Sequence, residues 1–515
     1  MSKKSQGSTF YHNTLTQTAG RLLYLLTRVG LPPLILHFVS LEEYGLWSTC
    51  FLLISYISMG TFGVSNVYIR YVAEYSAKGQ LASINGLVST GLVLTFAFSA
   101  CALGGIWLAM PLLLTSFNVA PQLHHTAEVL ILGTLATMLL DMTLGAFGTV
   151  LHGLQKIAQQ TIVWIISFLL ETALIVALLF YGYGVTSLLW AFFARYIFST
   201  IIYLVLCYRA IPGLHISLRL VKREFFSRFL HYGGILQVSG LLSIFMYSIE
   251  RVLAGHLTGL AAIAVLDLGQ KFPVMASQVF SSMNAGFLPA IVEAHSLGKQ
   301  QDIQRLYTQG MRYLNLLNGL AMGFIAPFAV WLLTAWMGHG DLLENTIAVM
   351  VCACVGYQLN VLTGPLSAYY QGINHPARTF GYLGWQLLFI GCGLLAAWRT
   401  IGFDVVIIAE IAMAARVLSA LIYLCRGNYQ LGLGHWQFIR SVLWPGIMPY
   451  LFGYGIMTAL QPWLSAQDAN RWLLIIILGV IGVFYTLLTG GFFYAYMCNK
   501  EEQEQIRQKL TRRKS

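Results

Sequence analysis

The chain has 515 residues, of which 57% are hydrophobic and only 10% are charged, and its mean hydropathy is +0.70. This balance excludes an ordinary soluble globular protein and predicts an all-α polytopic membrane protein. The 30 Lys and Arg outnumber the 19 Asp and Glu, but in a membrane protein the placement of the cations matters more than their sum, and we expect no nucleic-acid partner. The eight cysteines show neither a CxxC motif nor a paired Cys/His spacing, so we expect buried thiols, with no disulfide framework, no metal site and no cofactor.

Fourteen apolar segments recur along the chain with short breaks between them. Each has about 20 residues or more and is therefore long enough to cross roughly 30 Å of hydrocarbon. We interpret them as 14 transmembrane helices. The segments are 13–39, 43–72, 83–115, 124–152, 158–181, 184–208, 229–257, 260–293, 304–338, 343–372, 377–400, 403–426, 439–462 and 470–498.

The cations predict the orientation of these spans. The first apolar segment is too long for a signal-peptide core and no A-x-A site follows it, so we expect it to stay in place as the first span. If the N-terminus is cytoplasmic, 21 of the 30 Lys and Arg lie inside, two lie outside and seven lie within spans. The positive-inside rule then places both termini in the cytoplasm.

An internal repeat relates the two halves of the chain. Segments of the first half match segments of the second half at a constant shift of 219 residues. The segments "AEYSAKGQLASI" and "VEAHSLGKQQDI" align at this shift, and "FSTIIYLVLC" and "LSALIYLC" align at nearly the same one. The matching pairs are His37 with His256, Leu41 with Leu260, Glu74 with Glu293, Gly79 with Gly298, Ile84 with Ile303 and Gly153 with Gly372. The constant shift makes chance matches a poor explanation.

The repeat predicts the domain organisation. Each copy holds six spans, and an even number returns the chain to the same side of the membrane, so the halves should be parallel and related by an axis along the membrane normal. We therefore expect two six-helix lobes around a central cleft, with two further helices at the C-terminus. The predicted parts are the N-terminal lobe 1–209, a cytoplasmic linker 210–228, the C-terminal lobe 229–427, spans 13 and 14 in 428–498, and a basic cytoplasmic tail 499–515. We interpret the tail as a solvated anchor, with a partner- or lipid-binding helix as the alternative.

The first span carries a polar stripe. Gln17, Arg21, Tyr24 and Arg28 fall at i, i+4, i+7 and i+11, which is one face of a helix, with the two guanidinium groups about 10 Å apart. A central cation costs roughly 2.5–3.5 kcal/mol in hydrocarbon, so the stripe should face a wet cavity or a partner. Arg21 could instead snorkel to the cytoplasmic surface, whereas Arg28 lies more than two turns from either end of the span.

Two further spans carry ionisable residues close together. Glu250 and Arg251 are adjacent and point about 100° apart around a helix, so each must find a different partner or water. Asp267 and Lys271 stand at i and i+4, which suits an intrahelical ion pair as well as a ligand site.

Four more ionisable residues lie within the spans of the two repeats. Arg195 and Arg416 occupy near-equivalent positions, which indicates a shared packing role and ranks them below the first-span arginines. Asp141 and Glu171 are candidate proton or cation sites, or they form a pair that bridges neighbouring spans. The complete set within spans is Arg21, Arg28, Arg195, Arg251, Lys271, Arg312 and Arg416, with Asp141, Glu171, Glu250, Asp267 and Glu410.

Four stretches carry a resemblance to a known family. They are "LEEYGLWSTCFLLISYISMGTFGVSNVYIRYVAEYSAKG", "ERVLAGHLTGLAAIAVLDLGQKFP", "FLPAIVEAHSLGKQQDIQRLY" and "GPLSAYYQGINHPARTF". Over about the first 430 residues the chain resembles the polysaccharide transporter (oligosaccharide flippase) family of the multidrug, oligosaccharidyl-lipid and polysaccharide exporter superfamily. Glu250 stands where the family pattern has Asp, and Ala264 where it has Gly. The two extra spans resemble the arrangement of lipid II flippases.

The resemblance implies a non-enzymatic flippase of the bacterial inner membrane that moves an undecaprenyl-diphosphate-linked oligosaccharide to the outer leaflet by alternating access. Bilayer lipid, a coupling proton or sodium ion and other polysaccharide-assembly membrane proteins are the partners it implies. Fixed cations in a wet cleft would replace the solvation of the diphosphate. The residues assigned to the diphosphate are Arg21, Arg28, Arg251 and Lys271. The residues expected to line the cleft are Gln17, Tyr24, Asn66, Glu250 and Gln270, and those expected to couple ions are Asp141 and Glu171.

Three other classes of protein fit the sequence less well. A cation-coupled drug exporter of the same superfamily should have an acidic or neutral cleft, whereas the spans here hold seven cations and five acids. A membrane glycan polymerase or glycosyltransferase usually needs large outer loops or a catalytic cluster, and this chain has no D-x-D and no G-x-x-x-x-G-K-[ST]. A membrane scaffold would leave the buried charges without a purpose beyond packing.

Overall fold

A computed structural model describes residues 3–58, 64–229, 234–338, 340, 343–465, 471–497 and 503 of the chain. Within these ranges every regular element is a helix, so the predicted all-α class is confirmed. Contacts group the chain into unit 1, residues 1–264, and unit 2, residues 265–515, with the division inside α11 (Leu260–Ser281). The predicted lobe boundary near residue 228 stays a prediction, and the predicted tail 499–515 lies outside the described residues apart from residue 503.

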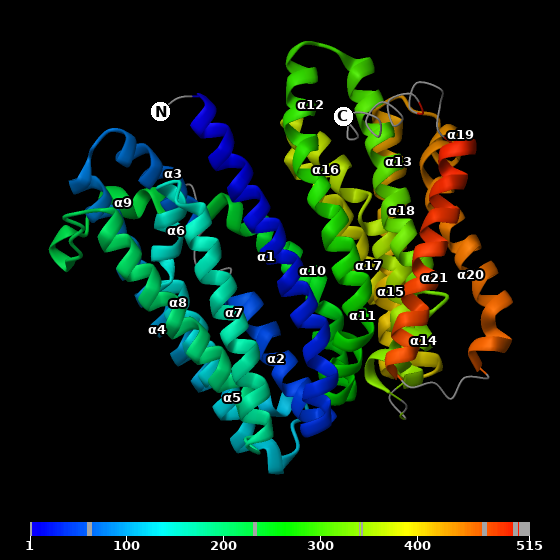
Figure 1. The fold of residues 1–515 in the computed structure, drawn as a ribbon, viewed down its shortest axis with the longest axis horizontal. Coiled ribbons are helices and arrows are strands. Elements are labelled where there is room, and N and C mark those ends of the chain that lie inside the picture. Colours follow the sequence, from blue (N-terminus) through cyan, green and yellow to red (C-terminus); the bar gives the residue numbers. More distant parts are fainter. Residues whose placement is uncertain are drawn as a thin grey trace. The chain divides into compact units, whose positions relative to one another are not determined.

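Unit 1 contains ten α-helices and two short 3-10 helices among its described residues. In Figure 1, α4, α5, α7 and α8 run side by side, and α1 packs on α7. The elements are α1 (Lys3–Phe38), α2 (Leu41–Ser58), α3 (Val64–Ala77), α4 (Leu81–Ser116), η2 (Pro121–Leu123), α5 (His124–Leu144), α6 (Ala146–Gly153), α7 (Ile157–Phe180), α8 (Thr186–Ala210), η3 (Leu218–Leu220), α9 (Arg223–Arg228) and α10 (Gly234–Thr258).

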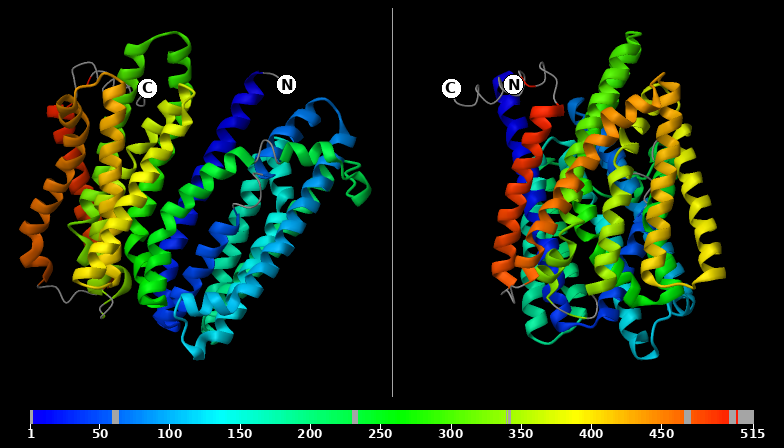
Figure 2. Two further views of the ribbon diagram at one scale, coloured as in Figure 1. Left: turned by 180° about the vertical axis from the view of Figure 1, so that it is seen from behind. Right: turned by 90° about the vertical axis from the view of Figure 1, so that its right-hand side faces the viewer.

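Unit 2 continues from α11 and ends in two long helices, α20 and α21. The hairpin of α17 and α18 runs along one side of this unit, in yellow and light orange in Figure 2. The elements are η5 (Ser282–Gly286), α12 (Phe287–Ser296), α13 (Gln300–Ile325), α14 (Ala329–Met337), α15 (Leu343–Asn360), α16 (Thr363–Gly372), η6 (Pro376–Thr379), α17 (Phe380–Thr400), α18 (Val405–Gln430), α19 (His435–Phe438), η7 (Ile439–Leu443), α20 (Trp444–Ser465), α21 (Arg471–Phe492) and η8 (Phe493–Met497).

The described helices include nine that are long and apolar enough to cross a membrane. A tenth is counted if α13 and α14, which meet at 67°, form one broken span. Pro327 lies in the break and has no backbone N–H for a continuous helical ladder, which explains the bend. The chain is therefore a multi-pass membrane protein, and the finer count of 14 spans stays a prediction.

The backbone repeats at the shift that the sequence predicts. Four pairs of helices begin at residues that this shift aligns: Leu41 with Leu260, Leu81 with Gln300, His124 with Leu343, and Thr186 with Val405. The turn between α3 and α4 has Gly79 at φ 67°, and the turn between α12 and α13 has Gly298 at φ 66°. This left-handed conformation suits glycine because a Cβ is strained there. The two halves thus share turn chemistry as well as helix positions.

The linker between the repeats is attached to α4 in unit 1. Phe225 is buried against that helix, and the side chain of Asn85 donates to the carbonyl of Gly213 at 3.2 Å. The backbone N–H of Lys222 donates to Thr90 Oγ1 at 3.2 Å. The linker, which the sequence predicts only as a polar connection, is therefore packed against α4 of unit 1.

Helices α13 and α20 approach closely in unit 2 because small residues face each other. Gly319 and Gly323 of α13 form a G-x-x-x-G pair, and a Cβ at Gly323 would lie 2.7 Å from the backbone carbonyl carbon of Pro449. A Cβ at Gly319 would lie 2.6 Å from the carbonyl oxygen of Gly446. In a membrane such positions let two backbones pack against each other, so these glycines dock α20 on the repeat.

Candidate functional site

The polar stripe of α1 faces α7. The ring centroid of Tyr24 lies 5.4 Å from that of Trp164 and 5.5 Å from that of Phe168. One turn earlier, a Cβ at Gly20 would lie 2.9 Å from Ile165 Cδ1, so a side chain there would need the isoleucine to shift. The aromatic contacts and the small residue hold this face of α1 against α7.

Two arginines of unit 1 share one carboxylate. Arg28 of α1 donates from Nη2 to both carboxylate oxygens of Glu171 on α7, at 3.1 Å each. Arg195 of α8 donates from Nη1 to Glu171 Oε2 at 2.7 Å. We call Arg28, Glu171 and Arg195 the arginine–glutamate centre.

The arginine–glutamate centre is buried unevenly and carries an excess of positive charge. The side chain of Glu171 is 1% exposed and that of Arg195 is 10% exposed, whereas that of Arg28 is 23% exposed. Two guanidinium groups share one carboxylate, so the three residues sum to one positive charge. Arg28 Cζ also lies 4.9 Å from the ring centroid of Tyr24. Arg28 is therefore the most exposed member of the arginine–glutamate centre.

Sequence reasoning separated residues that the structure brings together. The sequence predicts Arg28 as a diphosphate ligand, and it predicts Glu171 as an ion-coupling residue or as a partner of Asp141 in a pair that bridges neighbouring spans. It ranks Arg195 below the first-span arginines. One signal was available for Arg195: Glu171 lies nine residues before the end of α7, and Arg195 lies nine residues after the start of α8. Two helices joined by a short turn place such residues at the same depth, so their pairing follows from hairpin geometry. Asp141 of α5 is half-buried and also interacts electrostatically with Arg195.

Three other predicted residues lie on α1 and α3. Arg21 is exposed on α1, about two turns before Arg28. Asn66 is exposed near the start of α3. The backbone of Gln17 belongs to α1, but its side chain lies outside the described residues.

The predicted pair of Glu250 and Arg251 lies on α10 of unit 1. Glu250 is fully buried, whereas Arg251 is half-buried. Just before this pair, Ser248 donates to the hydroxyl of Tyr56 on α2 at 2.7 Å. The roles predicted for Glu250 and Arg251 stay predictions.

The predicted residues of α11 belong to unit 2. Lys271 donates to Asp267 Oδ2 at 2.7 Å, which is the intrahelical pair that the i, i+4 spacing predicts. Gln270 is buried and accepts a hydrogen bond from the hydroxyl of Tyr357 at 3.4 Å. The diphosphate role proposed for Lys271 would require an anion to compete with Asp267.

Arg416, the counterpart of Arg195 in the second repeat, has different surroundings. It is 1% exposed, donates from Nη1 to Met413 Sδ at 3.3 Å, and its Cζ lies 4.7 Å from the ring centroid of Tyr357. The sequence of α17, which packs on α18, contains no Asp or Glu. The two near-equivalent arginines therefore have different partners: Arg195 pairs with a carboxylate, whereas Arg416 contacts a methionine sulfur and a tyrosine ring.

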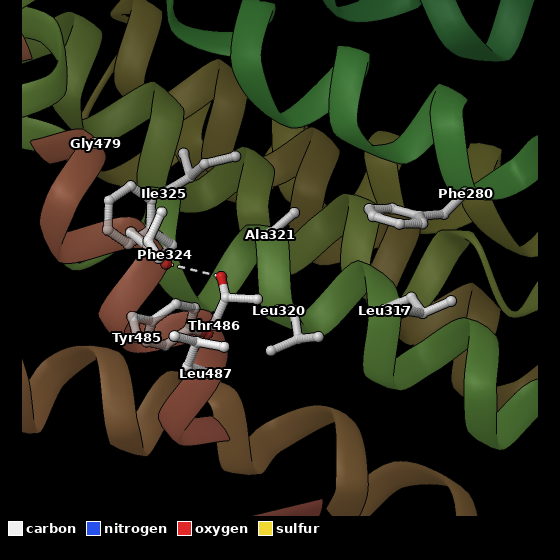
Figure 3. Close-up of a pocket in the computed structure, with 12 residues that line it drawn as sticks. Phe280, Leu317, Leu320, Ala321, Phe324, Ile325, Gly479, Tyr485, Thr486 and Leu487 are labelled. Carbon is white, nitrogen blue, oxygen red and sulfur yellow. Dashed lines mark hydrogen bonds between the residues drawn. The ribbon is translucent and has the colours of Figure 1, made fainter. Parts of the chain in front are cut away.

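An apolar groove of about 720 Å³ lies along unit 2 between α13 and α21 (Figure 3). Leu320, Ala321 and Phe324 project into it from α13, and Leu487 closes the side formed by α21. The hydroxyl of Thr486 is occupied by a hydrogen bond to the carbonyl of Gly482 at 2.8 Å, so the wall offers few polar groups. Sequence reasoning did not find this groove, because it depends on how α21 packs against the second repeat.

Comparison with known sequences identifies the family. The sequence model described as "Polysaccharide biosynthesis protein" matches residues 9–295, which include the whole arginine–glutamate centre. A curated relative, the uncharacterized membrane protein EpsK of Bacillus subtilis strain 168, is 20% identical over 344 residues. That match covers 65% of this chain and 66% of EpsK, so it spans about two thirds of each protein.

Comparison with solved structures identifies the fold. The lipid II flippase MurJ in an inward closed conformation matches with a TM-score of 0.69 at 13% identity, over 94% of this chain and 99% of that chain. An inward-facing multidrug resistance MATE family transporter of the MOP superfamily matches with a TM-score of 0.64 at 16% identity, over 81% of this chain and 94% of that chain.

A MOP superfamily transporter from Pyrococcus furiosus, described as having a binding pocket of reverse polarity, matches with a TM-score of 0.54 at 16% identity. This match covers 82% of this chain and 94% of that chain. The three likenesses establish a shared fold. The family match covers more than half of the sequence and confirms the predicted resemblance: the chain belongs to the polysaccharide biosynthesis protein family.

Proposed function

We propose that the protein is a flippase that moves an undecaprenyl-diphosphate-linked oligosaccharide across the bacterial inner membrane by alternating access, for the synthesis of a cell-surface polysaccharide. The observation that carries this proposal is the arginine–glutamate centre. It combines buried cations with a partly exposed guanidinium on a polar helix face, and it lies within the family match.

The centre suits a diphosphate for a physical reason. A diphosphate cannot enter hydrocarbon without replacement of its solvation, and guanidinium groups bind phosphate oxygens through two parallel hydrogen bonds. The substrate would bind Arg28 and displace Glu171, which would keep its shorter hydrogen bond to Arg195. Glu171 then acts as an internal counter-ion that offsets part of the positive charge when no substrate is bound. This exchange avoids leaving either arginine buried without an anion.

Other predicted residues complete the proposed pathway. Arg21, Arg251 and Lys271 would contact the diphosphate at successive stages of transport. The residues proposed to line the cleft are Gln17, Tyr24, Asn66, Glu250 and Gln270. The groove between α13 and α21 would hold part of the polyprenyl chain, because its lining is almost wholly apolar and a buried CH₂ group contributes about 0.8 kcal/mol.

We further propose that the two lobes rock to expose the cleft to each side in turn, with a proton or sodium ion as the coupling ion. Asp141 and Glu171 are the coupling candidates. Protonation of Glu171 would weaken its pairing with Arg28 and so favour binding of the substrate there, whereas Asp141 would act through Arg195.

The decisive experiment measures glycan export in cells that depend on Arg28→Ala protein, with insertion and thermal stability measured in parallel. We expect at least about a tenfold loss of export, because a hydrogen bond to a charged group is worth about 1.5–3 kcal/mol. Arg28→Lys keeps the charge but loses the planar fork, so it should give an intermediate rate. Arg305→Ala removes an exposed cation of unit 2 and is the matched control. Full export by stably inserted Arg28→Ala protein would refute the proposed role.

A cation-coupled multidrug exporter is the competing function. Its substrates are organic cations, which the guanidinium of Arg28, the most exposed member of the arginine–glutamate centre, would repel. Efflux of cationic dyes from intact cells separates the two functions. Efflux that depends on this protein and survives Arg28→Ala would favour the exporter.

A further inference from the structure

A second basic site lies at one end of unit 2, where α16 and α18 end and α17 begins. A pocket of about 280 Å³ has Tyr370 and Tyr423 in its wall, both nearly fully buried, with Trp385 half-buried beside them. Arg378 and Arg426 are exposed at its rim. This volume is just below the roughly 300–1,000 Å³ of sites that enclose drug-sized molecules, so the pocket accommodates a small headgroup and not an oligosaccharide.

Aromatic rings and an amide hold the two guanidinium groups at the pocket. Arg378 donates from Nη1 to Gln430 Oε1 at 2.9 Å, and its Cζ lies 5.7 Å from the ring centroid of Tyr370. Arg426 Cζ lies 5.4 Å from the ring centroid of Trp385. Such contacts restrain the planes of the guanidinium groups and leave N–H donors for a ligand.

The residues that build the pocket supply no counter-ion for the two arginines. The sequences of α16, η6 and α17 contain no Asp or Glu, and Glu410 of α18 lies more than four helical turns before Arg426. Among the ion pairs formed by described residues, none includes Arg378 or Arg426. Two like charges at one small pocket repel each other unless an anion joins them.

The first repeat shows that the fold does not need these arginines. Gly153 aligns with Gly372, which places Gln159 opposite Arg378, and Tyr203 aligns with Tyr423, which places Leu206 opposite Arg426. The aligned tyrosine is buried in both units. These two positions are therefore arginine in the second repeat only, so the shared fold does not require arginine there.

The pocket lies where apolar spans leave the hydrocarbon. Candidate spans end at Gly372 and Gln430, and another begins at Ala377. Clusters of arginine at this level attract anionic lipids, and Trp and Tyr favour the same interface. The positive-inside rule predicts that this is the cytoplasmic face.

We propose that this pocket binds the phosphate group of an anionic membrane lipid, with Arg378 and Arg426 as the two donors to the phosphate oxygens. Free inorganic phosphate offers the same chemistry, and the experiment distinguishes the two sources. The proposal is independent of the flippase function, because it concerns a peripheral site and needs no translocation.

The test uses the full-length protein in nanodiscs of phosphatidylcholine, titrated with phosphatidylglycerol and read by native mass spectrometry of bound lipid. The variant R378Q/R426Q should bind phosphatidylglycerol at least about tenfold more weakly than the natural protein. The control R305Q/R399Q removes the same charge from exposed positions, one of them at the far end of α17, and should bind normally. Equal binding by the natural protein and R378Q/R426Q would overturn the proposal.

A second arm adds inorganic phosphate to phosphatidylcholine nanodiscs. Binding of phosphate alone, lost in R378Q/R426Q, would support the anion site and assign it to a free anion instead of a lipid. A third measurement needs no variant: phenylglyoxal modification of the natural protein, mapped by peptide mass spectrometry. Phosphatidylglycerol should slow modification of Arg378 and Arg426 and leave that of Arg305 unchanged, and equal rates at all three would overturn the proposal. Glycan export can fail or persist independently of all these outcomes.

Discussion

Helices α4 and α13 occupy the same position in the two repeats but have different surroundings. Gly104 of α4 and Gly323 of α13 are equivalent residues under the repeat alignment. A Cβ at Gly104 would meet nothing within 4 Å, whereas one at Gly323 would lie 2.7 Å from the backbone of α20. Near Gly104, the side chains of Trp107 and Leu108 are 63% and 74% exposed. The extra helices therefore cover α13 and leave the corresponding face of α4 open.

The two repeats also differ in buried charge, and here the first repeat has the feature that the second lacks. Unit 1 places Glu171 of α7 between two arginines, whereas the equivalent residue of the second repeat is Ile390 of α17, which is 3% exposed. The first repeat carries the ionic centre, and the second repeat carries the apolar groove and the docked helices. One backbone plan thus supports a charged part in the first repeat and an apolar part in the second.

The largest expected effect comes from removing the shared carboxylate. Glu171→Leu leaves two guanidinium groups in the interior without their anion, and we expect a loss of about 3–5 kcal/mol in unfolding free energy. Ile390→Leu, at the matching position of the second repeat, conserves volume and should cost under about 1.5 kcal/mol. Unfolding in detergent, followed by circular dichroism, measures both values.

Glu171→Leu combined with Arg195→Leu is the control for this assignment. The double variant removes one of the two unpaired cations, so it should recover part of the stability that Glu171→Leu loses. Strictly additive losses would mean that Glu171 and Arg195 do not depend on each other, and the arginine–glutamate centre would not be a unit.

A smaller effect should follow from crowding the helix crossing of unit 2. Gly323→Leu inserts a side chain between α13 and α20, and overpacking of this kind costs about 1–3 kcal/mol. Gly104→Leu changes the matching residue of α4, where the space is open, and should be neutral or slightly stabilising because leucine favours the helix. Thermal unfolding of the two variants measures the difference, and equal losses would contradict the different packing of the two helices.

The repeat could be predicted from the sequence because it depends on local features: the positions where helices start, the glycines in turns and the spacing of residues within one helix. The shift between the two copies reappears in the starts of four helix pairs and in the positive φ of Gly79 and Gly298. The i, i+4 spacing likewise predicted the pair of Asp267 and Lys271. In each case the deciding residues are close together, or recur in a second copy, so no knowledge of tertiary packing is needed.

The candidate site was harder to predict because its members are distant in sequence. Arg28 and Glu171 are separated by 143 residues, and helix periodicity says which face each occupies but not which helix that face meets. The groove between α13 and α21 was hard to predict for the same reason, because its two walls are distant in sequence and form a groove only where α21 packs near α13. The equal distances of Glu171 and Arg195 from the turn between α7 and α8 could have predicted their pairing. The contact of Arg28 with this pair could be found only from the structure.

The smallest expected effect concerns a surface ion pair present in one repeat only. Lys78 donates to Glu74 at 2.6 Å, and both side chains are well exposed, whereas the residue equivalent to Lys78 in the second repeat is Leu297, which is 60% exposed. Lys78→Leu gives the first repeat the residue of the second. Because an exposed i, i+4 pair on a helix contributes only about 0.3–0.5 kcal/mol, we expect a loss of at most about 0.5 kcal/mol in detergent unfolding. Lys78→Gln, which removes the charge without adding apolar surface, should behave the same way. A loss near that of Glu171→Leu would mean that surface charge, and not the buried centre, distinguishes the stability of the two repeats.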